Sequence, residues 1–144
     1  MTLTLDIARI LIRAILDESA KAGMKPLSVC VVDAGGFPVA FERSDGTAPM
    51  RFKIAHGKAS GAARMGIGSR ALFERAQAQP YFIQAVNSLS DGALVPVPGG
   101  VLIKSGGTII GAVGVTGDTS DNDEAVAVAA ITAAGFEADT GASA

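Results

Sequence analysis

The stretch 96–134 constrains the fold most, because its order of apolar residues and glycines leaves few alternatives. Two apolar runs, at 101–103 and 109–116, flank a Ser-Gly-Gly sequence at 105–107. Glycines permit the positive φ angles that tight hairpin turns require. The first part of this stretch therefore predicts two antiparallel strands joined by a tight turn.

A polar, acidic run at 118–124 follows the hairpin and a glycine bend at Gly117. Ser and Thr hydroxyls satisfy the free N–H groups of a first helical turn, and carboxylates there suit the positive end of the helix dipole. The run lacks the oxygen-ligand spacing of a calcium loop. We therefore expect it to cap a buried helix formed by the small, apolar residues 125–134, rather than to bind a metal ion.

The remaining patterns predict an α+β protein with a mostly antiparallel sheet of about five strands, in a single domain that spans 1–144. The other expected elements are helices at 5–22, 50–65, 69–77 and 80–86, and strands at 27–32, 37–43 and 94–95. Pro38 cannot donate to a ladder, so the strand 37–43 should lie at an edge or place its proline at a bulge. The helix 50–65 is rich in Gly, Ala and Ser, which would let another backbone approach it closely.

Composition narrows the class of protein. The chain has 144 residues, of which 49% are hydrophobic and 18% charged, and its net charge is −2 without a basic block. This balance argues against nucleic acid and membranes as partners and favours a homo-oligomer that covers apolar surface. No apolar run approaches the length of about 20 residues that a membrane span needs, and the N-terminus lacks a basic leader. The lone Cys30, which we expect to be buried, fits a reducing cytoplasm.

Three segments resemble a known family. They are VVDAGG at 31–36, PVPGGVLI at 96–103 and GAVGVTGDTSDNDEAVA at 111–127. All are similar to segments of the GlcG/HbpS-like haem-binding proteins, a family that includes the C-terminal domain of PduO-type corrinoid adenosyltransferases. The resemblance runs from about residue 5 to residue 137. It implies a profilin-like sheet with helices packed on its faces, and haem or a related tetrapyrrole as ligand.

His56 is the only histidine and therefore a candidate ligand of haem iron, which takes His, Met, Cys or Tyr. On the predicted helix it shares a face with Phe52 and Ala59. A histidine in this setting is a packed structural residue, an iron ligand or a general base, and the sequence leaves these roles open. The other polar residues of this helix, Lys58 and Arg64, are expected on solvated or interface faces.

Several residues could hold an anionic group. The loop Pro98-Gly99-Gly100 would expose backbone donors to a carboxylate or propionate, or it would form a tight bend that the sheet requires. Arg43 and Arg51 flank a seven-residue loop and could grip a carboxylate bidentately. Thr116 and Thr119 could add hydroxyl groups near the start of the last helix.

These observations lead to one leading hypothesis and two alternatives. The leading hypothesis is a cytoplasmic, homo-oligomeric protein that binds haem or a related tetrapyrrole. Its role would be to bind, sense or degrade that ligand. The first alternative is a metal-independent tautomerase, isomerase or lyase, in which Arg43 and Arg51 hold a small 2-oxo or 2-hydroxy acid while His56 moves a proton. The second is a corrinoid-associated accessory protein. No phosphate loop, dinucleotide fingerprint, zinc spacing or nucleophile–base pair is present in the sequence.

Overall fold

A five-stranded antiparallel sheet in the order β2-β1-β4-β3-β5 lies at the centre of the protein, for which a computed structural model describes residues 1–143. The strands are β1 (Ser28–Asp33), β2 (Pro38–Arg43), β3 (Gly100–Ser105), β4 (Thr108–Thr116) and β5 (Glu137–Asp139). The helices are α1 (Leu5–Lys21), α2 (Arg51–Met65), α3 (Ser69–Ala78), α4 (Pro80–Leu89) and α5 (Ser120–Ala133). The predicted α+β class and the antiparallel sheet are confirmed.

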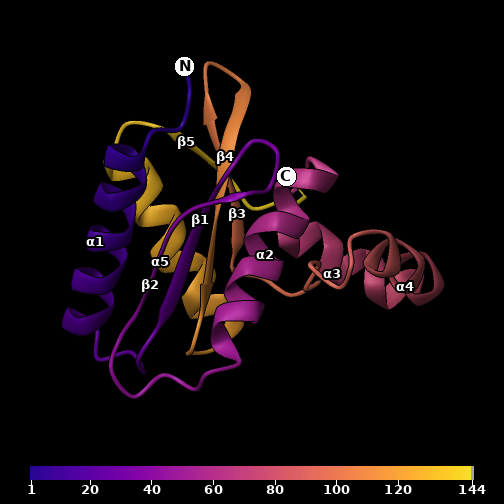
Figure 1. Ribbon diagram of the computed structural model, residues 1–144, viewed down its shortest axis with the longest axis horizontal. Helices are drawn as coiled ribbons and strands as arrows, with labels where there is room; N and C mark the ends of the chain where they lie inside the picture. Colours follow the sequence, from indigo (N-terminus) through magenta and orange to yellow (C-terminus); the bar gives the residue numbers. More distant parts are fainter. Residues whose placement is uncertain (144) are drawn as a thin grey trace.

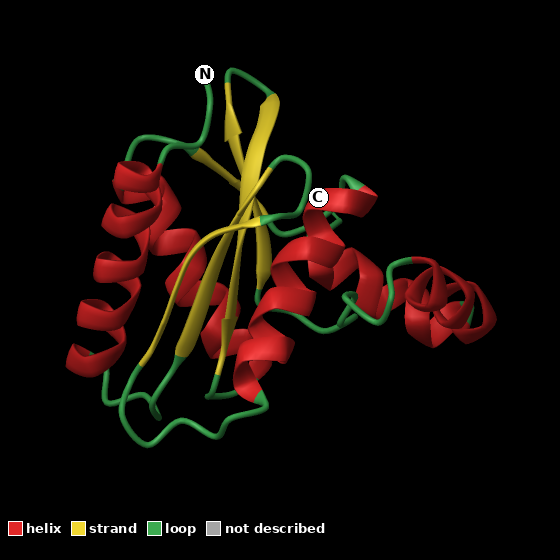
Figure 2. Ribbon diagram, in the orientation of Figure 1, coloured by secondary structure: helices red, strands yellow, loops and turns green. Residues whose placement is uncertain are grey.

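Helices cover both faces of the sheet (Figures 1 and 2). The helices α1 and α5 pack on one face and enclose the larger apolar core, while α2 packs on the opposite face. The helices α3 and α4 continue from α2 and extend away from the sheet at the right of Figure 1. No helix within residues 1–143 combines the length and the apolar character needed to cross a membrane.

The acidic run caps α5, as its composition predicts. Thr119 is the N-cap, and its hydroxyl accepts a hydrogen bond from the Asn122 amide at 3.2 Å. The Asp118 carboxylate accepts hydrogen bonds from the backbone amides of Lys25 and Thr119 and from the Asn122 side chain, and these bonds lower the pKa of Asp118 to about 2. Within the described residues no group of His, Cys, Asp and Glu side chains is arranged to hold a metal ion.

Of the two edge strands, β2 lies where the sequence predicts, whereas β5 was not predicted. The strand β2 lies at an edge, and its pairing with β1 shifts register between Val31 and Val32, where Pro38 pairs. The strand predicted at 94–95 is wrong. The Val95 amide donates instead to the Gly57 carbonyl of α2 at 3.1 Å, and β5 pairs with the outer edge of β3.

The backbone of α2 touches the backbone of the sheet directly. A Cβ atom at Gly114 would lie 2.0 Å from the Ala55 carbonyl oxygen, and one at Gly100 would lie 2.2 Å from the Lys58 carbonyl oxygen. The alanines of α2 that face the sheet, Ala55 and Ala59 among them, are fully buried. The small residues therefore allow the close approach that the sequence predicts, and they fix the position of α2 over β3 and β4.

This contact predicts that Gly114→Ala lowers the free energy of unfolding by about 3 kcal/mol, because the added methyl group cannot fit beneath the Ala55 carbonyl. Urea denaturation followed by circular dichroism measures the loss. The control is Gly35→Ala, where the nearest atom to a new Cβ lies 3.3 Å away on the Phe37 ring, a side chain that can shift. Equal, small losses in the two variants would contradict the direct backbone contact.

Candidate functional site

A groove lies between α2 and the edge strand β2. Its larger cavity, of about 480 Å³, is lined by Gly35, Gly36, Phe37, Pro38, His56, Ser60, Arg64, Asp91 and Ala93. A second cavity of about 270 Å³ is lined by Phe52, Lys53, His56, Asp91, Gly92 and Ala93. Because His56, Asp91 and Ala93 line both cavities, we treat them as one site, the α2–β2 groove. Its volume is in the range of small-molecule sites.

One face of α2 supplies the groove with its aromatic and polar side chains. Phe52, His56, Ser60 and Arg64 recur every four residues, so each is the i,i+4 neighbour of the one before and together they form a slanted row along α2. The His56 ring stacks on Phe52 with ring centroids 6.1 Å apart and planes within 7° of parallel. Phe52 in turn makes an edge-on contact with Phe41 of β2, with centroids 4.7 Å apart.

The His56 imidazole is half-buried and remains chemically available. Neither ring nitrogen hydrogen-bonds to another group in the described part of the chain. A packed structural histidine normally finds a partner for at least one nitrogen. His56 can therefore offer a nitrogen lone pair to a metal centre or exchange a proton with a ligand in the groove.

Charged groups lie on two sides of the groove. Arg64 is exposed, as the sequence predicts, and its stem packs over the β1–β2 turn, where a Cβ at Gly36 would lie 2.7 Å from Arg64 Cγ. Asp91 follows α4 and has φ +55°, a conformation that no other non-glycine residue within 1–143 adopts. Asn and Asp tolerate this left-handed region better than most residues, and the turn aligns the loop that forms one wall of the groove.

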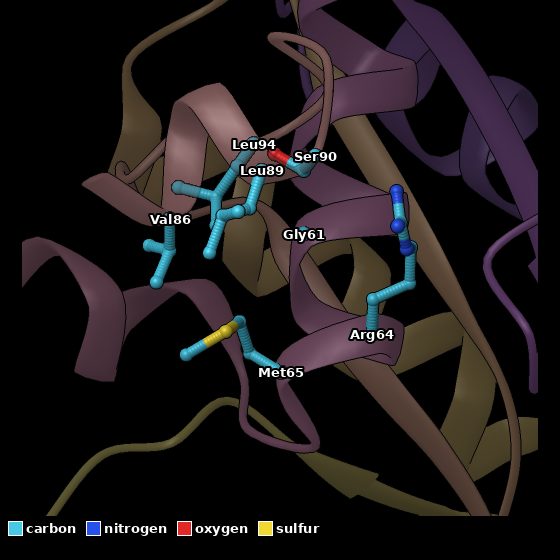
Figure 3. Close-up of a pocket in the computed structure, with 7 residues that line it drawn as sticks. All are labelled: Gly61, Arg64, Met65, Val86, Leu89, Ser90 and Leu94. Carbon is cyan, nitrogen blue, oxygen red and sulfur yellow. The ribbon is translucent and has the colours of Figure 1, made fainter. Parts of the chain in front are cut away.

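A smaller apolar cavity of about 170 Å³ lies between α2 and α4 (Figure 3). The side chains of Met65, Val86 and Leu94 gather around it, whereas Arg64 points away from them (Figure 3). Its volume is below the range of about 300–1,000 Å³ that is typical of small-molecule sites. The α2–β2 groove is therefore the better candidate.

The structure brings two of the predicted anion-binding residues together at the start of α2. Arg51 Nη1 donates a hydrogen bond to Thr116 Oγ1 at 2.8 Å. Arg43 is exposed at the end of β2, and β1 lies between Arg43 and Thr116 of β4. The two cavities that His56 lines include neither Arg43 nor Arg51.

The loop Pro98-Gly99-Gly100 is buried against α2 and β4. The Gly100 amide donates to Ser69 Oγ at 2.7 Å, and the Gly99 carbonyl accepts from the Val115 amide at 2.9 Å. Gly99 has φ +124°, and a Cβ there would lie 2.6 Å from the Val115 carbonyl oxygen. These contacts define a bend that needs glycine, and a role of the loop in ligand binding stays a prediction. The hydroxyl of Thr119, also a predicted ligand group, caps α5.

The prediction of a solvated or interface position for Lys58 is wrong. Its side chain is 2% exposed, and Lys58 Nζ donates to the Val115 carbonyl at 2.9 Å and to Asp123 Oδ2 at 3.5 Å. Asp123, 1% exposed, also accepts from the Asp118 amide at 3.0 Å. Burial lowers the pKa of Lys58 and raises that of Asp123, while the attraction between the two charges opposes both shifts. The sequence holds one signal of this burial, since Lys58 lies within a run of Ala, Gly and Ser.

Comparison with known proteins identifies the family. The chain belongs to the family described as "Haem degrading protein HbpS-like", whose sequence model matches residues 3–132. A search among curated proteins finds no match.

Solved structures share the fold over nearly the whole chain. A PduOC–haem complex is 25% identical, with a TM-score of 0.84 over 94% of this chain and 97% of that chain. A double mutant of Streptomyces reticuli HbpS is 28% identical, with a TM-score of 0.78 over 92% and 87% of the two chains. Klebsiella pneumoniae protein ORFY, at 24% identity and a TM-score of 0.84 over 93% and 91%, has the same fold.

The buried ion pair predicts that Lys58→Ala lowers the free energy of unfolding by about 3–5 kcal/mol, because the variant leaves Asp123 buried without a counter-charge. The double variant Lys58→Met/Asp123→Asn removes both charges and keeps an acceptor for the Asp118 amide. It should recover most of that loss. Urea denaturation of both variants provides the measurement.

The exposed lysine of the same helix serves as the control. Lys53→Ala should change the free energy of unfolding by less than about 0.5 kcal/mol. If Lys58→Ala behaves like Lys53→Ala, the buried pair does not hold α2 and α5 together.

Proposed function

We propose that this protein binds haem or a related tetrapyrrole in the α2–β2 groove, where His56 would ligate the metal. Membership of the HbpS-like family and similarity to a protein crystallised with haem support the class of ligand. The observation that carries the position of the site is that the only histidine of the chain lines both cavities of the groove with its ring nitrogens unpartnered.

The donor set of the groove fits haem. Haem iron takes His, Met, Cys or Tyr as a protein ligand, and haem supplies redox and oxygen chemistry that the axial ligand and the surrounding polarity tune. Cys30 is fully buried, and burial raises the pKa of its thiol to about 12, so it is not an accessible thiolate. Tyr81 lies on α4, outside the two groove cavities. No methionine lines either cavity, so His56 is the ligand that the groove offers.

Apolar and cationic side chains suit the rest of a haem molecule. Phe37 is 71% exposed and Phe52 39% exposed, so both offer apolar aromatic surface to a flat macrocycle. Arg64 has no carboxylate partner in the described chain and can bind a propionate. Asp91, on the opposite wall beside His56, would repel a propionate and can accept a hydrogen bond from the imidazole.

The enzymatic alternative requires that His56, Arg43 and Arg51 line one cavity. The cavities beside His56 contain Arg64 instead of Arg43 and Arg51. The groove therefore favours tetrapyrrole binding, and both the proton-transfer enzyme and the corrinoid-associated protein stay predictions from the sequence.

The proposal predicts that His56→Ala abolishes or strongly shifts the Soret band that forms when haemin is added to the protein, because the iron loses its nitrogen ligand. Added imidazole should restore the band, since it can occupy the space that the side chain leaves. Absorption titration with haemin, with and without imidazole, measures both effects.

Two further variants separate ligation from packing. His56→Gln keeps side-chain bulk against Phe52 and should lose the band like His56→Ala, whereas Arg13→Gln on the exposed side of α1 should bind haemin like the wild type. A His56→Ala protein with the wild-type spectrum and affinity would remove His56 from the site.

We further propose that the protein is a homo-oligomer that works in the cytoplasm. The helix α4 contains no charged residue, and its Tyr81 and Leu89 are 67% and 79% exposed. It packs on α3 and extends away from the sheet (Figure 1). Apolar side chains gathered on a projecting helix favour contact with a second copy of the chain. The cytoplasmic location rests on the sequence alone.

Oligomerisation predicts a mass in solution that is a multiple of 14.4 kDa. Leu89→Glu should lower that mass, because it buries a charge in the contact, whereas Gln77→Glu on the exposed surface of α3 adds the same charge and should leave the mass unchanged. Multi-angle light scattering at micromolar concentration measures all three proteins. A wild-type monomer would refute the proposal.

A further inference from the structure

We propose that the protein has a second binding site, for a carboxylate, at the corner where α2 begins. The corner is formed by Ser28 of β1, Arg43 of β2, Thr116 of β4 and Arg51 of α2, and we call it the α2 corner. It is separate from the α2–β2 groove, because none of these residues lines the cavities beside His56.

The register of the sheet places three of these side chains in one row. Ser28 pairs with Arg43 on one side and with Thr116 on the other, and paired residues of neighbouring antiparallel strands project from the same face. That face is the one under α2. Two residues further along β1, Cys30 packs with Ala55 of α2, whereas the alternate residue Val29 packs in the core beneath α1 and α5.

Arg51 of α2 contacts the row at Thr116. It is the first residue of α2, and its Nη1 donates to Thr116 Oγ1 at 2.8 Å. The first turn of the helix therefore lies over the end of the sheet that carries Ser28 and Thr116. Arg43, exposed on the edge strand β2, pairs with Ser28 and is separated from Thr116 by β1.

The Ser28 hydroxyl indicates that the corner is built for a polar partner. Ser28 is fully buried, and its Oγ is the one buried side-chain nitrogen or oxygen within residues 1–143 without a hydrogen-bond partner. Native proteins pair the great majority of such atoms, because an unpaired buried hydroxyl loses its solvation without compensation. Its position in the row directs it toward the first turn of α2, between the two arginines.

The charges of the corner favour an anion. No carboxylate of the described chain lies within ion-pair distance of Arg43 or Arg51. The first turn of α2 has no acidic residue and begins with an arginine, although cations are unfavourable at the positive end of a helix. Lys58 adds a third positive charge near Arg51, and Asp123 neutralises only the charge of Lys58. Two positive charges therefore stay uncompensated.

The donors match a carboxylate better than a more highly charged anion. Arginine forks bind the two coplanar oxygens of a carboxylate bidentately, and the hydroxyls of Ser28 and Thr116 can donate to its remaining lone pairs. Both the free carboxylate of a small acid and the carboxylate of a larger ligand have this chemistry.

Titration with sodium acetate tests the site. In ¹⁵N-labelled protein, acetate should shift the side-chain Nε–H signals of Arg43 and Arg51 in a saturable way, against sodium chloride of equal ionic strength. Arg43→Gln should weaken acetate binding by about tenfold or more without loss of folding, because the Arg43 side chain makes no hydrogen bond within residues 1–143. Ser28→Ala should weaken it as well and should not lower the melting temperature, because it removes an unpartnered hydroxyl. Arg13→Gln is the control and should bind acetate like the wild type.

Several results would overturn the proposal. Acetate shifts no larger than those of chloride, or equal affinity in Arg43→Gln, Ser28→Ala and Arg13→Gln, would show that the corner does not bind carboxylates. Tighter binding of inorganic phosphate than of acetate would assign the corner to another anion. Because the titration contains no haemin and leaves His56 intact, its failure is distinguishable from failure of the haem proposal.

Discussion

The close contact between α2 and the sheet determines most of the structure. Gly100 and Gly114 lack the side chains that would hold a helix at the usual distance, so the α2 backbone lies directly on β3 and β4. Lys58 is therefore buried, and its ammonium group donates hydrogen bonds to the Val115 carbonyl and to Asp123 instead of to water. The glycines thereby create both the tight packing and the need for a buried acidic partner on α5.

Each side of α2 performs a different task. Its alanines face the sheet, and Lys58 faces the buried Asp123. The side over β2 has Phe52, His56 and Arg64, which form one wall of the groove. The His56 ring stacks on Phe52 and lines the same cavities as Asp91. A ligand that binds there meets a preformed wall, which reduces the entropy cost of binding.

Local sequence patterns predict the parts of the fold that depend on neighbouring residues. The hairpin at 105–107 and the Thr119 cap require only the glycines and the polar run themselves, and both are present. The strand β5 could not be predicted in this way, because Glu-Ala-Asp has no apolar alternation and becomes a strand only through pairing with β3. Val95 shows the opposite effect, since an apolar residue that suits a strand hydrogen-bonds to α2 instead.

The residues of the two candidate sites were predictable only in part. His56, Arg51 and Thr116 could be selected by residue type, because few side chains bind iron or carboxylates. The sequence does not reveal that His56 lies with Arg64 and Asp91 rather than with the two arginines, since that grouping depends on which side of α2 each residue occupies. The burial of Lys58 with Asp123, 65 residues further along the chain, depends on tertiary packing alone.

The most direct test of His56 as the iron ligand uses the fact that the chain has one histidine. In protein labelled with ¹⁵N only at histidine, the imidazole resonances report on His56 alone. After addition of haemin and cyanide, ligation to the low-spin ferric iron predicts that one ring nitrogen shifts far outside its diamagnetic range. Imidazole resonances that stay at their original positions while haemin is bound would contradict the assignment of His56 as the ligand.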